Sequence, residues 1–299
     1  INISSDKVIL HVFPQYFKLN DQDHIKDPIG MAGVRLEGNV HLITAPAINI
    51  KNLVKCINKA GFSARNGIAT GYASANSVVT EEDKESGILL LDIGAGTTDI
   101  MGFIEGFPIF TSVILVGGNN LTRDLAFGLK VSEGLAENIK KKHGCVYSGI
   151  VDPIDEIEVP VYGKNHVERI SKQTISSILE PRAEEIFMMV RKKLEERNIS
   201  LDSFTSGIVI TGGSAKIPGI AEVCEKVIGL PTRIGIAQNV GGISDEAHDP
   251  AYSAALGLCM GEALNSNEAG STAEKNPLVN KNSGGVMKKI GGIFKEILG

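Results

Sequence analysis

A carboxylate at the end of an apolar strand, followed by a glycine-rich turn, is the feature of this sequence best suited to chemistry. The stretch ILLLDIGAGTTDIMGF places aliphatic residues before Asp92, and Gly94, Ala95 and Gly96 follow directly. Glycine lets the backbone bend without a Cβ, so successive N–H groups can point at phosphate oxygens. A carboxylate beside a phosphate needs a divalent cation between the two anions. The pattern predicts a loop that binds a metal–nucleotide complex, with Asp92 reaching the metal.

Thr97 and Thr98 follow this turn and would add hydroxyl donors to the loop before a second strand begins. A dinucleotide-binding fingerprint requires a third glycine and a following helix, and both are missing here. A plain hairpin whose loop happens to contain two glycines is the alternative for this motif taken alone.

A second glycine turn lies further along the chain, in IVITGGSAKIPG. A β-branched strand over Ile208–Thr211 ends at Gly212, Gly213 and Ser214, and Pro218 precedes a helical pattern. Two adjacent glycines at a strand end allow a flat ring or a ribose to lie against the backbone. A tight turn between a strand and a helix is the alternative interpretation of this motif.

Composition places the chain among globular proteins with no global basic field. It has 299 residues, 42% of them hydrophobic and 22% charged, and a formal net charge of −5, which argues against nucleic acid as a partner. The four cysteines, Cys56, Cys145, Cys224 and Cys259, have no metal-like spacing, and we expect each to be a small buried hydrophobe in a reducing compartment.

Hydrophobic patterning predicts a mixed α/β chain. We expect strands over 88–91, 99–104 and 109–115, a short hairpin about residues 37–39, and helices in GYASANSVV and AYSAALGLCMGEAL. TEEDKES is interpreted as a charged surface connection. A long helical stretch is predicted from Val167 to Arg197, ended or kinked by Pro181.

Together these motifs resemble the actin/sugar kinase/Hsp70 ATPase superfamily. LLLDIGAGTTDI resembles its second phosphate loop, IVITGGSAKIPG its adenosine loop, and the two small-residue helices its connecting helices. Further segments, among them ILVGGNNLTRDLA, IEVPVYG and ILEPRAEEIF, resemble the FtsA family of bacterial cell-division proteins. The resemblance implies an α/β, actin-like (ribonuclease H-like) ATPase fold with an inserted subdomain called 1C.

This resemblance implies seven segments in the chain. They are 1–45, subdomain 1C (an SHS2-like insertion); 46–86, the remainder of subdomain 1A; 87–130, the first part of 2A; 131–200, subdomain 2B; 201–263, the second part of 2A; 264–284, a flexible linker; and 285–299, an amphipathic membrane-targeting helix.

The sequence departs from the family pattern in two ways, which concern ATP binding and ATP hydrolysis. The chain starts at Ile1 without an initiator methionine, and the family's first phosphate loop lies N-terminal to 1C, so we expect the actin-like fold to be N-terminally incomplete. Related bacterial actins carry a water-positioning carboxylate where this chain has Thr70. A threonine cannot act as a general base, so we expect at most weak ATPase activity and no catalytic residue.

Two groups of charged residues match family positions. Glu137 and Lys140 lie three apart on one helix face and match positions that approach the ribose and adenine; a solvated ion pair within the helix is the alternative. Arg169, Lys172 and Arg182 are candidates for binding the acidic and apolar C-terminal peptide of FtsZ on 2B, although most surface cations serve only solubility.

The final residues form a lysine-bearing apolar stripe after a polar tether. Wound as a helix, they are too short to span a bilayer but suit its interface, where lysines attract anionic lipids. The stripe and its flanking cations comprise Val286, Met287, Lys288, Lys289, Ile290, Ile293, Phe294, Lys295, Ile297 and Leu298. Docking of this helix on the protein's own body or on a partner is the alternative.

The resemblance therefore implies an adaptor that binds ATP and Mg²⁺, polymerises on the cytoplasmic face of the inner membrane at the septum, tethers FtsZ filaments there and helps to recruit other divisome proteins. A PilM-like component of a membrane assembly is the main alternative. A sugar kinase would leave the tail unexplained, and an Hsp70-like chaperone would need a substrate domain where the chain has only a short linker.

Overall fold

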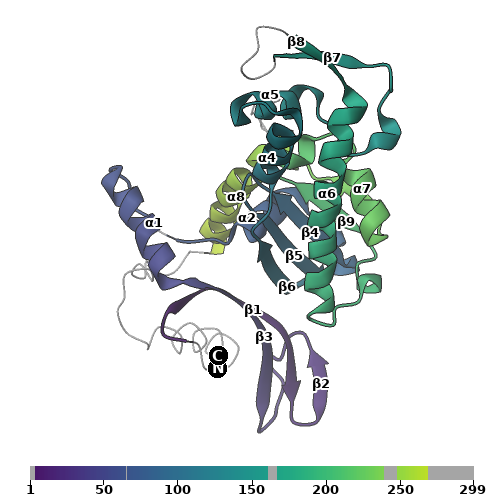
Figure 1. Ribbon diagram of the computed structural model, residues 1–299. Coiled ribbons are helices and arrows are strands. Elements are labelled where there is room, and N and C mark those ends of the chain that lie inside the picture. Colours follow the sequence, from purple (N-terminus) through teal and green to yellow (C-terminus); the bar gives the residue numbers. More distant parts are fainter. Residues whose placement is uncertain (1–3, 65, 161–166, 239–247, 269–299) are drawn as a thin grey trace. The chain divides into compact units, whose positions relative to one another are not determined.

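The computed structural model describes residues 4–64, 66–160, 167–238 and 248–268, with side chains up to residue 260 (Figure 1). The chain divides into two compact units. One is built chiefly on the described residues up to Ala69, and the other comprises Thr70–Gly106 and Phe110–Gly261. The seven segments expected from the sequence use different boundaries and stay predictions.

A three-stranded antiparallel sheet forms the first unit. Its strands are β1 (Lys7–Leu19), β2 (Gln22–Ile25) and β3 (Leu36–Pro46), in the order β2-β1-β3. The hairpin predicted about residues 37–39 is wrong, because β3 runs through them and each of the three is paired with a residue of β1. The chain reverses before Leu36, where the side-chain oxygen of Asn20 accepts the N–H groups of Val34 and Arg35. Helix α1 (Ala47–Lys59) follows, and none of its residues is buried.

A five-stranded mixed sheet forms the centre of the second unit. Its strands are β4 (Ile88–Ile93), β5 (Thr98–Ile104), β6 (Phe107–Ile114), β9 (Ile208–Thr211) and β10 (Thr232–Ile234), in the order β10-β9-β4-β5-β6. Strand β4 is antiparallel to β5 and parallel to β9. The apolar run predicts this strand correctly, and every residue of β4 is buried, as is typical of a strand in the middle of a covered sheet.

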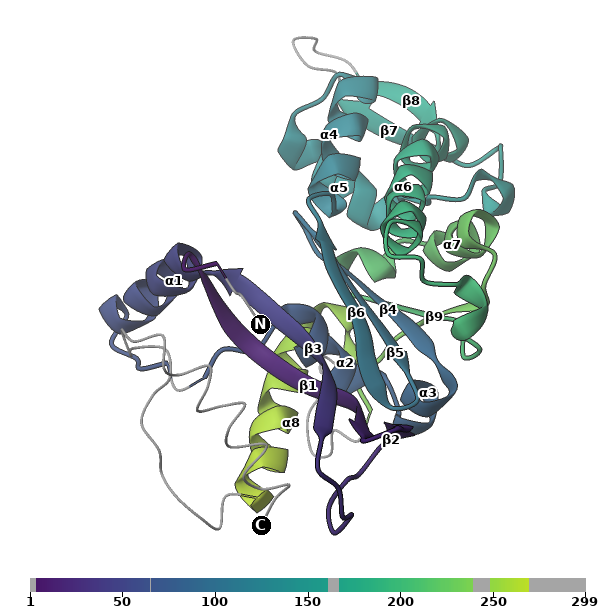
Figure 2. The same cartoon turned by 90° about the horizontal axis from the view of Figure 1, so that it is seen from below.

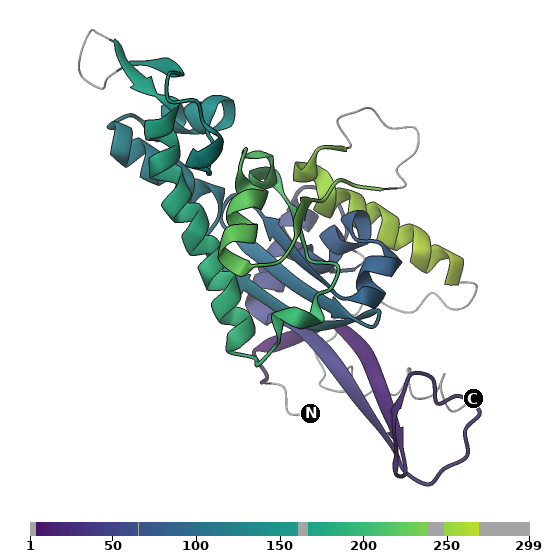
Figure 3. The ribbon, with the colours of Figure 1, turned by 90° about the vertical axis from the view of Figure 1, so that its right-hand side faces the viewer.

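Helices cover both faces of this sheet. Figures 2 and 3 show α2 (Thr70–Val78) and α8 (Ser253–Glu268) on one face, with α6 (Lys172–Glu195) and α7 (Ile220–Ile228) on the other. The small-residue helices predicted from the sequence are α2 and α8. A Cβ built at Gly257 would lie 1.6 Å from the carbonyl oxygen of Ala73, so the glycine allows these two helices to touch backbone to backbone.

The charged segment before β4 is a helix, α3 (Glu81–Ser86), and its prediction as a surface connection is wrong. Thr80 and Asp83 explain the difference, because they form a reciprocal capping box. The Thr80 hydroxyl accepts the N–H of Asp83 at 3.0 Å, and the Asp83 carboxylate accepts the N–H of Thr80 at 3.1 Å.

The remaining elements gather beyond one end of the sheet (Figure 1). They are α4 (Gly118–Leu129), α5 (Glu133–His143), and the antiparallel pair β7 (Glu156–Pro160) and β8 (Val167–Ser171). The long helix predicted from Val167 begins later, at Lys172, after Ser171 caps it. Pro181 does not end the helix, which buries apolar residues on both sides of the proline, Ile175 and Ile186 among them.

All four cysteines are expected to be buried, and two of them are. Cys145 and Cys224 are buried, and burial raises the pKa of the Cys224 thiol to about 12. Cys56 and Cys259 are exposed, against the prediction.

Within the described residues, no helix is long and apolar enough to cross a membrane. The predicted tether begins inside α8, and the rest of it and the terminal apolar stripe lie outside the described residues.

Candidate functional site

The glycine turn between β4 and β5 forms as the sequence predicts. The N–H of Gly94 donates to the carbonyl oxygen of Thr97 at 2.9 Å and closes the turn. Ala95 and Gly96, at its tip, are exposed. The turn lies between two buried strands, so the position of an exposed, glycine-rich backbone is fixed by the sheet. This is the geometry expected of a loop whose backbone approaches a ligand.

The first turn of α4 packs directly against this loop. The N–H groups of Gly118 and Asn119 donate to the carbonyl oxygens of Gly94 and Ala95, at 2.9 and 2.7 Å. A Cβ at Gly117 would lie 2.7 Å from the Gly94 oxygen, so a side chain there would separate helix and loop. Two free donors of the helix N-terminus are therefore satisfied by the loop itself.

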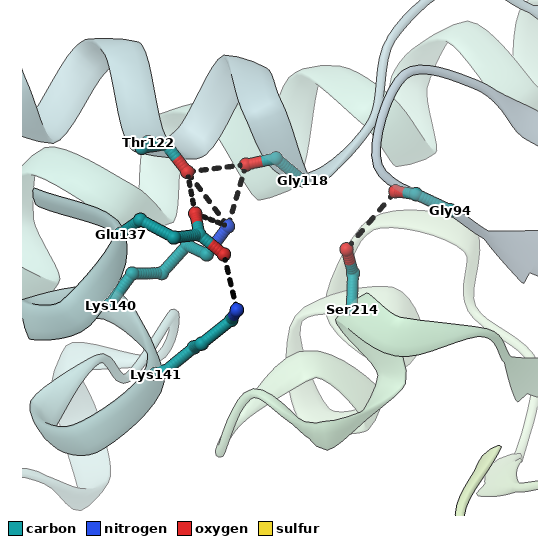
Figure 4. Close-up of polar contacts among 7 residues, drawn as sticks. All are labelled: Gly94, Gly118, Thr122, Glu137, Lys140, Lys141 and Ser214. Atoms are coloured by element: carbon teal, nitrogen blue, oxygen red, sulfur yellow. Dashed lines mark hydrogen bonds and ion pairs between the residues drawn. The ribbon is translucent and has the colours of Figure 1, made fainter. Parts of the chain in front are cut away.

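The second glycine turn reaches the same place. Gly212 has a φ of +87°, and a Cβ on it would lie 2.4 Å from Oδ1 of Asp92. Beyond Gly213, the buried Ser214 donates from Oγ to the carbonyl oxygen of Gly94 at 3.3 Å (Figure 4). The structure thus brings together the two glycine turns that the sequence presents as separate motifs.

Asp92 has a carboxylate neighbour that the sequence reasoning missed. Asp99 is paired with Asp92 across β4 and β5, so both side chains leave the same face of the sheet. Burial raises the pKa of Asp92, and a hydrogen bond from Ser74 Oγ at 2.5 Å partly opposes the shift. Burial, followed by the charge of Asp92, raises the pKa of Asp99 to about 6.

This pair fits a cation, because a positive ion would favour the charged form of both carboxylates, whose pKa values burial raises. Two carboxylates alone give an incomplete coordination shell. Among the described residues, no group of three or more His, Cys, Asp or Glu side chains could hold a metal ion. The arrangement therefore suits a cation that takes most of its ligands from phosphate oxygens and water, as Mg²⁺ commonly does.

The two threonines of the loop have different surroundings. Thr98 is fully buried and donates from Oγ1 to the carbonyl oxygen of Val116 at 2.9 Å, in the segment that leads to α4. Its only hydroxyl proton is thus used within the protein. Thr97 is half-buried at the end of the turn and is the better placed of the two to donate to a ligand.

Glu137 and Lys140 form more than a solvated ion pair. Lys140 is 7% exposed, and its Nζ lies 2.7 Å from Oε2 of Glu137. The same Nζ donates to the carbonyl oxygen of Gly118 and to Oγ1 of Thr122, at 2.9 and 2.8 Å (Figure 4). Burial alone would raise the pKa of Glu137, but hydrogen bonds from Lys140, Thr122 and Lys141 lower it to about 2.

The three basic candidates of the region 131–200 differ in exposure. Arg169, on β8, has a side chain 73% exposed that lies 3.7 Å from Glu158, and Lys172, at the start of α6, pairs with Asp155 at 2.7 Å. Arg182 is more enclosed. It donates from Nε and Nη2 to the carboxylate of Asp124 on α4, and it also pairs with Glu185.

The contacts that the start of α4 makes with the loop and with Lys140 were not predicted from the sequence. Their signal is GGNNLT, in which two glycines lie where a helix meets a loop. Asn120, three residues after Gly117, accepts the N–H of that glycine at 3.1 Å, and Thr122 lies one turn after Gly118. Asp99 had a signal as well, since an acidic residue one position into β5 must face Asp92 when the turn is this tight.

Family models match most of the chain. The model described as "Cell division protein FtsA" matches residues 89–257, and the one described as "SHS2 domain inserted in FTSA" matches residues 1–44. The chain belongs to the FtsA family. The Cell division protein FtsA of Borreliella burgdorferi is 40% identical over 261 residues, and that of Escherichia coli K12 is 36% identical over 265. These matches cover 87% and 86% of this chain, which spans 63% of the length of each FtsA relative.

Solved structures establish the actin-like fold expected from the sequence. MreB5 of Spiroplasma citri bound to AMPPNP has a TM-score of 0.57 at 22% identity, over 73% of this chain and 65% of that one. The PilM–PilN type IV pilus biogenesis complex has a TM-score of 0.60 at 17% identity, over 87% of this chain and 68% of the matched chain. At these identities the similarity concerns the fold alone.

Proposed function

We propose that this FtsA-family chain binds ATP with Mg²⁺ and uses the nucleotide for assembly. In this proposal it polymerises on the cytoplasmic face of the inner membrane, tethers FtsZ filaments at the septum and helps to recruit the divisome. The observation that carries the nucleotide part is the convergence of the exposed Gly94–Thr97 turn, the first turn of α4 and Ser214 around Gly94. Family membership supports the role in cell division.

Within this proposal each group of residues has a stated task. The backbone N–H groups of Ala95 and Gly96 and the hydroxyl of Thr97 would contact phosphates. Gly94, whose N–H donates to the carbonyl oxygen of Thr97, and Thr98 would support the loop. Asp92 and Asp99 would hold Mg²⁺, which neutralises phosphate charge when bound. Gly212, Gly213 and Ser214 would lie against the nucleoside, with Glu137 and Lys140 on its ribose and adenine side.

Hydrolysis is expected to contribute little. Thr70 is the first residue of α2, where related bacterial actins have a water-positioning carboxylate, and a hydroxyl is a poor general base at neutral pH. A nucleotide that is bound and only slowly hydrolysed suits a protein that needs one conformation for polymerisation. At most weak ATPase activity is therefore proposed.

The FtsZ part of the proposal rests on the exposed Arg169 of β8 and the half-buried Lys172 that follows this strand. Both pair with exposed carboxylates, Glu158 and Asp155, which an acidic peptide can replace at small cost. Arg182 remains a candidate, but a peptide would compete there with two carboxylates around a more enclosed guanidinium.

The test is fluorescence anisotropy with a labelled FtsZ C-terminal peptide. The double variant Arg169→Glu/Lys172→Glu reverses two charges at the proposed site, and Arg191→Glu/Lys193→Glu makes the same changes on the exposed C-terminal part of α6. We expect saturable binding that weakens at least about tenfold in the first variant and less than about twofold in the second. Equal losses would reject the site. Folded protein that binds no peptide would reject FtsZ tethering and favour a PilM-like role.

Membrane attachment rests on the sequence of the tail, which lies outside the described residues. An apolar stripe with Lys288, Lys289 and Lys295 would lie in the interface of an anionic bilayer, and polymerisation would add the weak anchors together. Co-sedimentation with vesicles tests this step. We expect binding to vesicles that contain phosphatidylglycerol, with a marked loss in Lys288→Glu/Lys289→Glu; binding to neutral vesicles that is unchanged in this variant would reject the electrostatic part.

A further inference from the structure

Gly118 is hydrogen-bonded both to the phosphate loop and to α5 of the candidate site. Its N–H donates to the carbonyl oxygen of Gly94 in the phosphate loop, and its own carbonyl oxygen accepts from Nζ of Lys140 on α5, each at 2.9 Å. One residue at the start of α4 thus lies between the backbone of the loop and the Glu137–Lys140 pair (Figure 4). A Cβ here would lie 2.6 Å from Oγ of Ser214, so a side chain at this position would have to displace that hydroxyl.

Thr122 completes this arrangement one turn further along α4. It is 6% exposed, and its Oγ1 donates to Oε2 of Glu137 at 2.5 Å while accepting from Nζ of Lys140. The same hydroxyl lies 3.1 Å from the carbonyl oxygen of Gly118. A hydroxyl has one proton, and the charged carboxylate is the stronger acceptor for it.

Counting donors separates the roles of Lys140 and Glu137. An ammonium group has three N–H donors, and those of Lys140 have three partners within 2.9 Å: the oxygen of Gly118, Oγ1 of Thr122 and Oε2 of Glu137. The Glu137 carboxylate can accept further hydrogen bonds. The side chain is 32% exposed, and within the part of the chain that the structure describes Oε1 has only Lys141 as a charged partner, at 3.2 Å. The carboxylate is the member of the pair that can still accept from a ligand hydroxyl.

We propose that Thr122 is a positioning residue, which holds the Glu137 carboxylate to accept a ribose hydroxyl and, through Lys140 and Gly118, fixes that carboxylate relative to the phosphate loop. This inference rests on the proposed function, because it assigns the nucleoside side of the same site. Lys140 then acts within the protein by fixing Gly118 and Glu137, and Glu137 provides the contact with the ribose. The fixed separation of carboxylate and loop selects ligands that carry both a ribose and a phosphate chain.

The variant Thr122→Val tests this role because it removes the hydroxyl and keeps the shape of the side chain. Thr122→Ser keeps the hydroxyl and is the conservative rescue. Thr44→Val makes the same change at an exposed position of β3 and is the matched control. Thermal unfolding and circular dichroism check that each protein is folded. The readout is the affinity for ATP, for 2′,3′-dideoxy-ATP and for inorganic tripolyphosphate, measured by calorimetry with MgCl₂ present.

We expect wild type, Thr122→Ser and Thr44→Val to prefer ATP over the dideoxy nucleotide by about tenfold, and Thr122→Val to lose most of that preference. Affinity for tripolyphosphate should change less than about twofold. Equal weakening of all three ligands in Thr122→Val would overturn the inference and leave Thr122 a structural residue. Preference retained in Thr122→Val would also overturn it. Wild-type protein that binds none of the three would reject the proposed function itself, and the inference with it.

Discussion

Asp92 and Asp99 lie directly opposite each other across β4 and β5, with both carboxylates on the same face of the sheet. The pairing follows from the tightness of the Gly94–Thr97 turn, which leaves no residue to offset the two strands. Like charges opposite each other destabilise a sheet, and burial adds to the cost. The stability lost here is compatible with a site that is completed when a cation binds.

The variant Asp99→Asn tests this relationship. Above about pH 6, the Asp99 carboxyl is ionised. Urea denaturation there should give the variant a free energy of unfolding roughly 0.5 to 1 kcal/mol higher than that of wild type. Because the folded state raises the pKa of Asp99, the repulsion disappears as pH falls toward 4, and the advantage of the variant should disappear with it.

Adding MgCl₂ with ATP should reduce the difference in free energy of unfolding between Asp99→Asn and wild type, since only wild type keeps both carboxylates for the cation. Asp21→Asn, at an exposed position of the other unit, is the control and should match wild type throughout. A variant that is less stable than wild type at neutral pH would show that Asp99 is held by favourable contacts, against the interpretation given above.

The central elements of this fold could be predicted because they depend on local patterns. The apolar run before Asp92 predicts a strand, and the small-residue segments around Ala73 and Gly257 predict two helices, and the structure has all three elements. The contacts of Thr122 and Lys140 could not be predicted in the same way. They depend on how α4 and α5 pack, and i,i+3 spacing alone also fits a solvated ion pair.

Errors in the element predictions have a common physical origin. The Thr80–Asp83 capping box turns a charged segment into a helix, and β1 keeps residues 37–39 extended by pairing with them. In each case a hydrogen-bonding partner, either three residues away or on another strand, overrides composition. The exposure of Cys56 and Cys259 likewise depends on which helix face is covered, which composition does not reveal.

Gly212 and Gly229 test close packing at the site. Both have positive φ angles, +87° and +88°. Gly229, with ψ 18°, is in the left-handed helical region, where alanine costs about 1 kcal/mol in backbone strain. Gly212 has ψ 170°, a conformation that essentially only glycine adopts, so alanine costs more there. Only at Gly212 would the new Cβ meet other atoms, Oδ1 of Asp92 at 2.4 Å and the carbonyl oxygen of Ile93 at 2.7 Å. We expect Gly212→Ala to lower the free energy of unfolding by about 1 to 3 kcal/mol more than Gly229→Ala, measured by urea denaturation. Equal losses would mean that the loop moves aside freely.

Gly257 and Gly134 test the contact between α2 and α8. Both are helical, but a Cβ at Gly257 would lie 1.6 Å from the oxygen of Ala73, whereas one at Gly134 would meet nothing within 4 Å. Gly134→Ala should raise stability by about 0.5 to 1 kcal/mol, because alanine is the better helix former. Gly257→Ala should lower the thermal midpoint clearly, since the two helices must separate. A neutral Gly257→Ala variant would contradict backbone contact between them.

Glu137 should make stability depend on pH in the acid range. Its pKa falls from the ordinary 4.5 to about 2 in the folded protein, where Lys140 and Thr122 donate to the charged carboxylate. A lowered carboxyl pKa stabilises the folded state fully above the unfolded pKa, and the stabilisation is lost as pH falls from about 4.5 toward 2. Urea denaturation at intervals from about pH 6 to pH 3 should therefore show wild type more stable than Glu137→Gln at pH 6, with a difference that shrinks toward pH 3. Glu133→Gln, an exposed change on the same helix, should show a much smaller difference. A wild-type advantage that stays constant down to pH 3 would mean that the Glu137 carboxylate is not selectively stabilised in its charged form.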